Sequence, residues 1–299
     1  MEKVLFSMLC DQWLEFKYSS IKESTYARYS RVICNYINPI LGNVECGELK
    51  ESDIIQFINN LNKKKLKPKT IQDISVIVKS IIRYGNMKND MKLTLGLIPC
   101  PKVSTSRIKI FNSEEINKIE NYTKENESLK NLGVLLSLYS GMRLGEICAL
   151  KWESIDLLNH SIEVTKTMQR IYIGDKTQVV ITSPKTKTSY REIPIYDQLY
   201  DLLISVETKN GYVLSGNDKY VEPRGLQRYF KMMTKNLEIQ NVNFHILRHT
   251  FATYCIQCEV DVKSLSEILG HASVNITLNR YVHSSFELKQ KQIKKLNFK

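Results

Sequence analysis

The chain has 299 residues, 42% of them hydrophobic, which is enough for two domains that each bury a core and excludes disorder as the main state. Its net charge of +12, from 43 basic and 31 acidic residues, favours a polyanionic partner. The longest nearly unbroken apolar run, from Leu132 to Met142, falls well short of the roughly 20 residues that cross a bilayer. With seven scattered cysteines and no secretory cleavage signal, we expect a soluble cytoplasmic protein.

Residues 1–100 predict a bundle of four helices without strands, because apolar residues recur three and four positions apart. The first helix is expected around residues 5–13, and the second around residues 29–36, before Pro39 and Gly42 break the pattern. A third helix is expected from about Ser52. A fourth opens with Thr70 and Asp73 in an arrangement like a capping box.

A basic loop joins the third and fourth predicted helices. It contains Lys63, Lys64, Lys65, Lys67 and Lys69. A loop of this charge leading to a helix N-terminus favours phosphate, so we predict that these lysines bind DNA. A solvated surface loop is the alternative.

Residues 101–110 predict a linker, because this stretch is rich in proline, serine and threonine and lacks helical periodicity. The second domain is expected over residues 111–299. It opens with a helix capped by Asn112 and Glu115, followed by a buried helix from Leu129 to Tyr139. Short alternating segments around residues 162–164, 179–181 and 191–195 predict an antiparallel meander, and helices return from Leu226. The predicted fold is therefore mostly α with a small antiparallel sheet.

Three motifs in the second domain carry candidate chemistry. In SGMRLGEICALKW, Arg143 opens a helix whose positive N-terminal end makes an arginine unfavourable unless an anion joins it, and Glu146 can hold the guanidinium. In NFHILRHTF, Asn243 is a candidate N-cap. His245 and Arg248 share one face of that helix, opposite a buried face of Leu247, Phe251 and Cys255, and His249 is a structural candidate.

The third motif is LGHASVNITLNRYVH. Gly270 is expected to end a short helix and present His271, and Ser273 can cap a further helix that carries Tyr281 on a stripe with Val274 and Leu278. Taken singly, each motif has a plainer interpretation: an ion pair, a solvated polar face or a half-buried aromatic. Cys255 and Cys258 form one CxxC pair without a second pair, which favours small core residues over a zinc site.

Together, Arg143, His245, Arg248, His271 and Tyr281 resemble, in order and context, the active site of the tyrosine recombinase (phage integrase) family. The resemblance covers the whole chain and implies an N-terminal helical, SAM-like core-binding domain and an α+β catalytic domain, in the form without an arm-binding domain. It also implies a catalytic lysine in the turn PKTKTSYREIPI. Lys185 matches best, and Lys187 is the alternative.

The resemblance implies an enzyme that cuts and rejoins DNA through a covalent 3'-phosphotyrosine intermediate at Tyr281. Arg143 and Arg248 would then bind the nonbridging oxygens, His245 and His271 would add hydrogen bonds, and Lys185 would be the general acid. Glu146 would support Arg143. With cations supplied by the protein, we expect neither a metal nor another cofactor.

The resemblance further implies double-stranded DNA as partner, a tetramer on two DNA sites, and a C-terminal tail, Phe286 to Lys299, that docks on a neighbouring protomer. The expected role is the integrase of a bacterial mobile element, acting at the nucleoid without a membrane. A Xer-like dimer resolvase, a DNA invertase, a type IB topoisomerase and a catalytically silent DNA-binding protein are the alternatives. The target site cannot be derived from these residues.

Overall fold

The computed structural model describes residues 3–88, 90–97, 109–126, 128–173, 176–183, 190–282, 290, 293 and 294. The chain divides into two compact units: Met1–Ser106 with Ile171–Gln178, and Arg107–Arg170 with Val179–Lys299. In the described residues, no helix is long and apolar enough to cross a membrane. The predicted linker lies mostly outside the described residues, so each unit is taken by itself.

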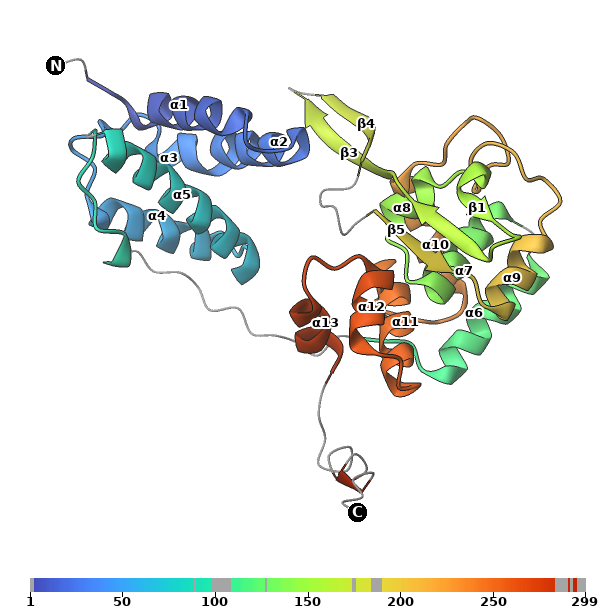
Figure 1. The fold of residues 1–299 in the computed structure, drawn as a ribbon. Helices are drawn as coiled ribbons and strands as arrows, with labels where there is room; N and C mark the ends of the chain where they lie inside the picture. The colour runs from blue at the N-terminus through green and yellow to red at the C-terminus, as the bar shows by residue number, and fades with distance from the viewer. Residues whose placement is uncertain are drawn as a thin grey trace. The chain divides into compact units, whose positions relative to one another are not determined.

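The first unit is helical (Figure 1). Its elements are α1 (Phe6–Tyr18), α2 (Glu23–Val32), a π-helical turn (Ile33–Ile37), α3 (Asn38–Leu41), α4 (Glu51–Lys63), α5 (Pro68–Lys88) and a 3-10 turn (Leu95–Leu97). Apolar side chains of α1, α4 and α5, including Trp13, Phe57 and Ile74, form its core. Between residues 3 and 97, the described backbone forms no strand beyond the isolated bridge of Leu5 with Glu45.

Two local expectations for this unit were wrong. The second predicted helix does not stop at Pro39, because the helical path continues through the π-helical turn into α3. Proline lacks an N–H and so removes a regular helical hydrogen bond from the turn before it, where the π-helical turn lies. The fourth helix begins at Pro68, and Thr70 lies inside its first turn, where its N–H donates to the carbonyl of Lys67. Proline is favoured at that first position because its fixed φ suits the helix and its missing N–H would have no helical partner.

The second unit packs helices around small antiparallel sheets. Its elements are α6 (Ser113–Glu125), α7 (Leu129–Ser140), α8 (Leu144–Ala149), a 3-10 turn (Trp152–Ser154), β1 (Ile155–Asp156), β2 (Ser161–Val164), β3 (Thr167–Ile173), β4 (Lys176–Thr182), β5 (Arg191–Pro194), α9 (Asp197–Ile204), α10 (Pro223–Asn236), α11 (His245–Gln257), α12 (Val262–Leu269) and α13 (Val274–Tyr281). The predicted cap of α6 is confirmed, since Asn112 accepts from the N–H of Glu115 at 2.8 Å. The predicted burial of α7 is also confirmed. The fold class is therefore the predicted one.

The expected meander was wrong. Strand β2 lies between β1 and β5, pairing Ile162 with Ile193, while β3 and β4 form a separate two-stranded ribbon. The buried positions of β2 and β5 alternate on one face and pack into the core, whereas β4 has no fully buried residue. Because β2 and β5 both carry alternating core-facing residues, they pair with each other across the ribbon that separates them in sequence.

Candidate active site

Arg143 begins α8 directly after α7 ends at Gly141, which has φ +66°. The Oε2 atom of Glu146 accepts the backbone N–H of Arg143 at 2.9 Å, and its Oε1 atom accepts from the Arg143 guanidinium at 2.7 Å. The sequence prediction that Glu146 holds Arg143 is therefore confirmed. The Arg143 side chain is 34% exposed, which leaves part of the guanidinium open to an anion.

Arg248 on α11 is 1% exposed, so the plainer interpretation of this motif as a solvated polar face was wrong. Helix α11 is buried on most sides because it packs against α7 and α12 (Figure 1). The guanidinium donates to the carbonyls of Gly141 and Leu269, both at 2.7 Å. Burial and the charge of Arg143 lower the pKa of Arg248 to about 9, which leaves it cationic at neutral pH.

A third arginine, Arg191 on β5, was missed in the sequence. Its Nε donates to the carbonyl of Ile268 at 2.5 Å, and its Nη1 and Nη2 donate to Glu146 at 3.1 and 2.8 Å. A signal was available, because alternation along a strand puts Arg191 on the same face as Ile193, which is 1% exposed. A charged residue at a core-facing strand position indicates a buried partner.

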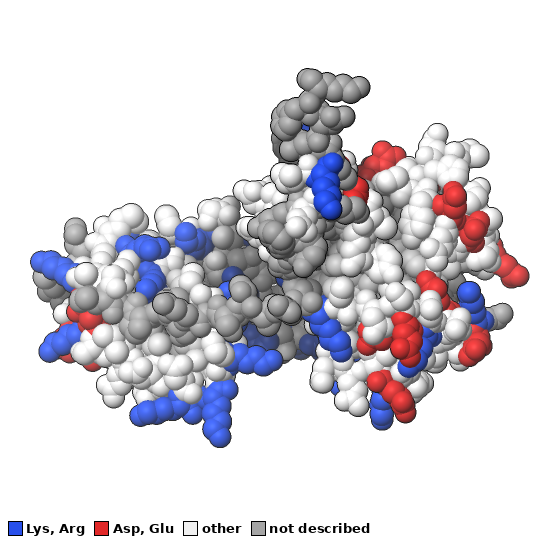
Figure 2. All heavy atoms as spheres, turned by 90° about the horizontal axis from the view of Figure 1, so that it is seen from below, with Lys and Arg blue, Asp and Glu red and all other residues white. Residues whose placement is uncertain are grey.

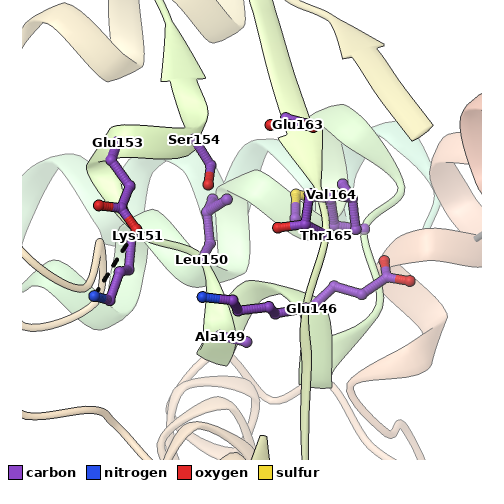
Figure 3. A pocket seen from close by; sticks show the side chains of 11 residues that line it. Glu146, Ala149, Leu150, Lys151, Glu153, Ser154, Glu163, Val164 and Thr165 are labelled. Atoms are coloured by element: carbon purple, nitrogen blue, oxygen red, sulfur yellow. Dashed lines mark ion pairs between the residues drawn. The ribbon is translucent and has the colours of Figure 1, made fainter. Parts of the chain in front are cut away.

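Glu146 lines a small cavity beside α8, but its carboxylate is bound by these arginines. Figure 3 shows its carboxylate directed away from the Lys151–Glu153 ion pair on the other side of that cavity. The cavity has a volume of about 10 Å³, close to that of one water molecule and too small for a substrate. Hydrogen bonds and charge from Arg191, together with the charge of Arg143, outweigh the effect of burial and lower the pKa of Glu146 to about 2. Glu146 is therefore ionised throughout the neutral range.

Tyr281 ends α13 and is 5% exposed. Its hydroxyl lies 2.8 Å from Nδ1 of His249, and its ring lies parallel to that of His271 with 6.3 Å between centroids. Burial raises the pKa of Tyr281, while the charges of Arg248, Arg280 and Arg143 oppose that rise. The predicted stripe was wrong at Leu278, which is 38% exposed; the buried face of α13 consists of Thr277 and Tyr281.

The histidines of the site are neutral at physiological pH. Gly270, with φ +62°, ends α12 as predicted and presents His271, whose Nδ1 lies 2.8 Å from the Thr277 hydroxyl. Burial, followed by the charges of Arg248 and Arg143, lowers the pKa of His271 to about 3. Loss of water around its ring, followed by the charge of Arg248, lowers the pKa of His245 to about 4.

One of the two predicted caps of the site helices is confirmed: Ser273 caps α13, whereas the N-cap of α11 is Phe244 and not Asn243. Asn243 accepts the N–H of His245 at 2.9 Å, and Ser273 accepts the N–H of Asn275 at 3.3 Å. His245 is exposed over part of its surface, but its ring packs edge-on against His249 with 4.5 Å between centroids, which removes water from that part of the ring. Local side-chain chemistry therefore fixes where α11 and α13 begin.

The structure therefore brings together five of the predicted residues around one cluster: Arg143, Glu146, Arg248, His271 and Tyr281, with His245 joined to it through His249. Three guanidiniums against one carboxylate leave excess positive charge, which suits a phosphate group. Lys185 and Lys187 lie outside the described residues. Among the residues that are described, no group of three or more histidines, cysteines or acids could hold a metal ion.

The remaining predicted residues lie elsewhere. The five lysines of the basic loop are exposed in the first unit, where Lys69 pairs with Asp73 at 3.1 Å. Cys255 packs in the small core around α11, as predicted, but Cys258 is exposed at the end of that helix. The two cysteines are therefore not equivalent core residues.

Comparison with known proteins identifies the family. The model of the phage integrase family matches residues 107–287, and that of the phage integrase N-terminal SAM-like domain matches residues 5–62. The chain therefore belongs to the phage integrase family, the tyrosine recombinases, as its motifs predicted.

Relatives and solved structures of similar chain length agree with this assignment. A XerC-like tyrosine recombinase of Caldanaerobacter subterraneus subsp. tengcongensis is 29% identical, over 99% of this chain and 83% of its own. The ICEBs1 integrase of Bacillus subtilis is 23% identical, over 91% and 77%. The Tn1549 transposon integrase in complex with transposon right end DNA has a TM-score of 0.81 at 19% identity, over 98% and 99%. The lambda integrase tetramer bound to a Holliday junction has a TM-score of 0.73 at 17% identity, over 95% and 81%.

Proposed function

We propose that this protein is a site-specific DNA recombinase that uses Tyr281 as its nucleophile. The observation that carries the proposal is the position of the Tyr281 hydroxyl: it lies 2.8 Å from Nδ1 of His249 and close enough to Arg248 for the charge of that guanidinium to lower the pKa of the hydroxyl. An aromatic hydroxyl next to a cationic, phosphate-sized cluster suits phosphoryl transfer better than a role in packing alone.

The proposed reaction transfers one DNA phosphate to the tyrosine and back. The phenolic oxygen of Tyr281 attacks phosphorus, the bond from phosphorus to the 5' oxygen breaks, and a 3'-phosphotyrosyl ester remains. The phenolic proton moves to the neutral imidazole of His249 that faces it. The leaving 5' oxygen takes a proton from Lys185, or from Lys187 in the alternative assignment. A 5' hydroxyl of the partner strand then reverses these steps and joins the strands.

Arg143 and Arg248 are proposed to bind the nonbridging oxygens, where negative charge increases in the transition state. Removing one such preorganised donor typically lowers a rate by about 10² to 10³. His245 and His271, neutral in the free protein, are proposed to add hydrogen bonds. The cations come from side chains, so the proposed reaction uses no metal or other cofactor.

Residues 1–100 are proposed as the core-binding DNA-binding domain, joined by residues 101–110 to the catalytic domain of residues 111–299. Figure 2 shows mainly lysine and arginine on the visible face of the first unit, and more acidic side chains on the second. The exposed lysines at positions 63, 64, 65, 67 and 69 fit phosphates at the start of α5. The Tn1549 integrase structure, in complex with transposon DNA, supports double-stranded DNA as the partner.

The active assembly is proposed to be a tetramer on two DNA sites, as in the lambda integrase tetramer bound to a Holliday junction. The C-terminal tail, Phe286 to Lys299, is proposed to dock on a neighbouring protomer. A hollow of about 580 Å³ lined by Leu138, Ile193, Phe251 and Ile268 offers an apolar acceptor for its Leu296 and Phe298. The proposed setting is the bacterial cytoplasm at the nucleoid, and the proposed role is integration and excision of a mobile element.

A nicked suicide substrate tests the proposal. DNA duplexes cut from the flanks of the gene, each nicked next to the candidate cleavage position, trap the covalent step because the short 5' product diffuses away. The wild type is expected to give a protein–DNA adduct, with the nucleotide on Tyr281 by mass spectrometry, and Tyr281→Phe is expected to bind DNA without an adduct. An adduct on another residue would contradict the assignment, and relaxation of any supercoiled plasmid without recombinants would indicate a topoisomerase.

A further inference from the structure

The carboxyl end of α12 binds three arginines in a row. Successive carbonyls accept one guanidinium each: Ile268 from Arg191, Leu269 from Arg248 and Gly270 from Arg143. The last carbonyls of a helix lack partners within the helix and carry partial negative charge, so cations are favoured there. Three residues far apart in sequence are thereby fixed to one helix end, directly before His271.

Glu146 joins two of these arginines. Its carboxylate accepts four hydrogen bonds, two from Arg143 and two from Arg191, and is 4% exposed. With Arg143 alone, the carboxylate would cancel the charge of the guanidinium that faces phosphate. Arg191 restores the missing positive charge and holds the carboxylate with a rigid two-pronged contact that a lysine cannot reproduce.

Arg191 itself has little access to a ligand. Its side chain is 5% exposed, against 34% for Arg143, and its hydrogen bonds run to Glu146 and Ile268. Its end also packs against Gly270, where an added Cβ would stand 3.0 Å from its Cδ and Nη1 atoms. Arg191 is therefore placed to act on the site through its neighbours and not by contact with DNA.

We infer that Arg191 is a positioning residue for strand cleavage: through Glu146 and the carboxyl end of α12 it fixes the guanidinium of Arg143 where the scissile phosphate binds. The inference rests on the proposed function.

Arg191→Lys tests this role, because it keeps the positive charge and removes the planar guanidinium that donates two hydrogen bonds to Glu146. Adduct formation is measured in single turnover on the suicide duplex at saturating protein, with DNA affinity measured separately by fluorescence anisotropy. We expect the adduct rate to fall about 100-fold, the usual effect of a misplacement of about 1 Å in a catalytic group, while the dissociation constant stays within about threefold. Arg170→Lys is the matched control, since the guanidinium of Arg170 on β3 pairs with Glu222 instead of Glu146, and the rate of this variant should equal that of the wild type.

A double-mutant cycle separates positioning from a general loss of structure. If Arg191 acts through Glu146, then Arg191→Lys combined with Glu146→Gln should be about as slow as the slower single variant. If the fold-reduction in adduct rate of the double variant equals the product of the two single-variant reductions, the inference is overturned. An Arg191→Lys variant as fast as the wild type would also overturn it.

A second variant covers the case in which Arg191→Lys does not fold. Arg191→Met with Glu146→Gln removes both charges of the buried Arg191–Glu146 pair together. Arg143 also loses its carboxylate partner, but it keeps the carbonyl of Gly270 and a side chain that is 34% exposed. This pair should fold, as judged by its thermal transition, and remain slow; a wild-type rate would overturn the inference. A wild type that forms no adduct would overturn the proposed function and this inference together, whereas a reactive wild type with a fast Arg191→Lys overturns the inference alone.

Discussion

Replacing Glu146 with glutamine will remove a defined part of the acid sensitivity of the second unit. The pKa of Glu146 is lowered from its ordinary value of 4.5 to about 2, mainly through Arg191 and Arg143, which outweigh burial. At 1.36 kcal/mol per pH unit, this difference corresponds to about 3 kcal/mol of unfolding free energy. Because the folded pKa is the lower one, that stabilisation is present above pH 4.5 and is lost as the pH falls towards 2. The side chain is 4% exposed, so screening by solvent is small.

Urea denaturation at a series of pH values between 7 and 2 measures this effect. The chain has two tryptophans, so a Trp13→Phe background leaves Trp152, buried in the core of the second unit, as the fluorescent reporter. The wild type should lose about 3 kcal/mol more than Glu146→Gln between pH 5 and 2. His249 and His271 gain protons in both proteins and cancel in the difference, whereas the charge of Glu146 raises the pKa of His245, so His245 adds a minor contribution of its own. Parallel curves would refute the pairing of Glu146 with the two arginines.

Three further predictions concern the site and the basic loop. Gly270→Ala, at φ +62°, should cost about 1 to 2 kcal/mol in urea denaturation and slow adduct formation; unchanged stability would contradict the left-handed end of α12. Replacing the lysines at 63–65 with glutamine should reduce the slope of log affinity against log salt by about 2.7, and an unchanged slope would exclude phosphate contacts there. In the DNA-free protein, proton NMR should show His271 and His245 still neutral at pH 5.5, because their pKa values are lowered to about 3 and about 4; a titration midpoint near 6.5 would contradict the packing of the site.

Local features of the site could be predicted from the sequence because their partners lie within one turn of a helix. Arg143 with Glu146, Gly270 at the end of α12 and Ser273 at the start of α13 all involve residues a few positions apart. The capping prediction at Thr70 failed because the helix begins earlier, at Pro68. A start at Pro68 and a cap at Thr70 are both favourable at a helix N-terminus, so the local sequence did not decide between them.

Distant contacts could not be predicted in this way. The burial of Arg248 depends on carbonyls 107 and 21 residues away, and that of Arg191 on a carbonyl 77 residues away. Charged residues are seldom fully buried, so residue type alone predicts that Arg248 and Arg191 are exposed. The contact of His249 with Tyr281 spans 32 residues and carries no motif of its own. Such pairings become visible only once the helices are packed.

The burial of Tyr281 limits when the proposed chemistry can occur. A duplex that meets the free protein finds a cationic surface at Arg143, but Tyr281, the proposed nucleophile at the end of α13, is only 5% exposed. If Tyr281 is the nucleophile, a scissile phosphate can reach its hydroxyl only after the end of α13 moves. The resting conformation itself would then restrain cleavage of DNA that is met at random, before any recognition of sequence.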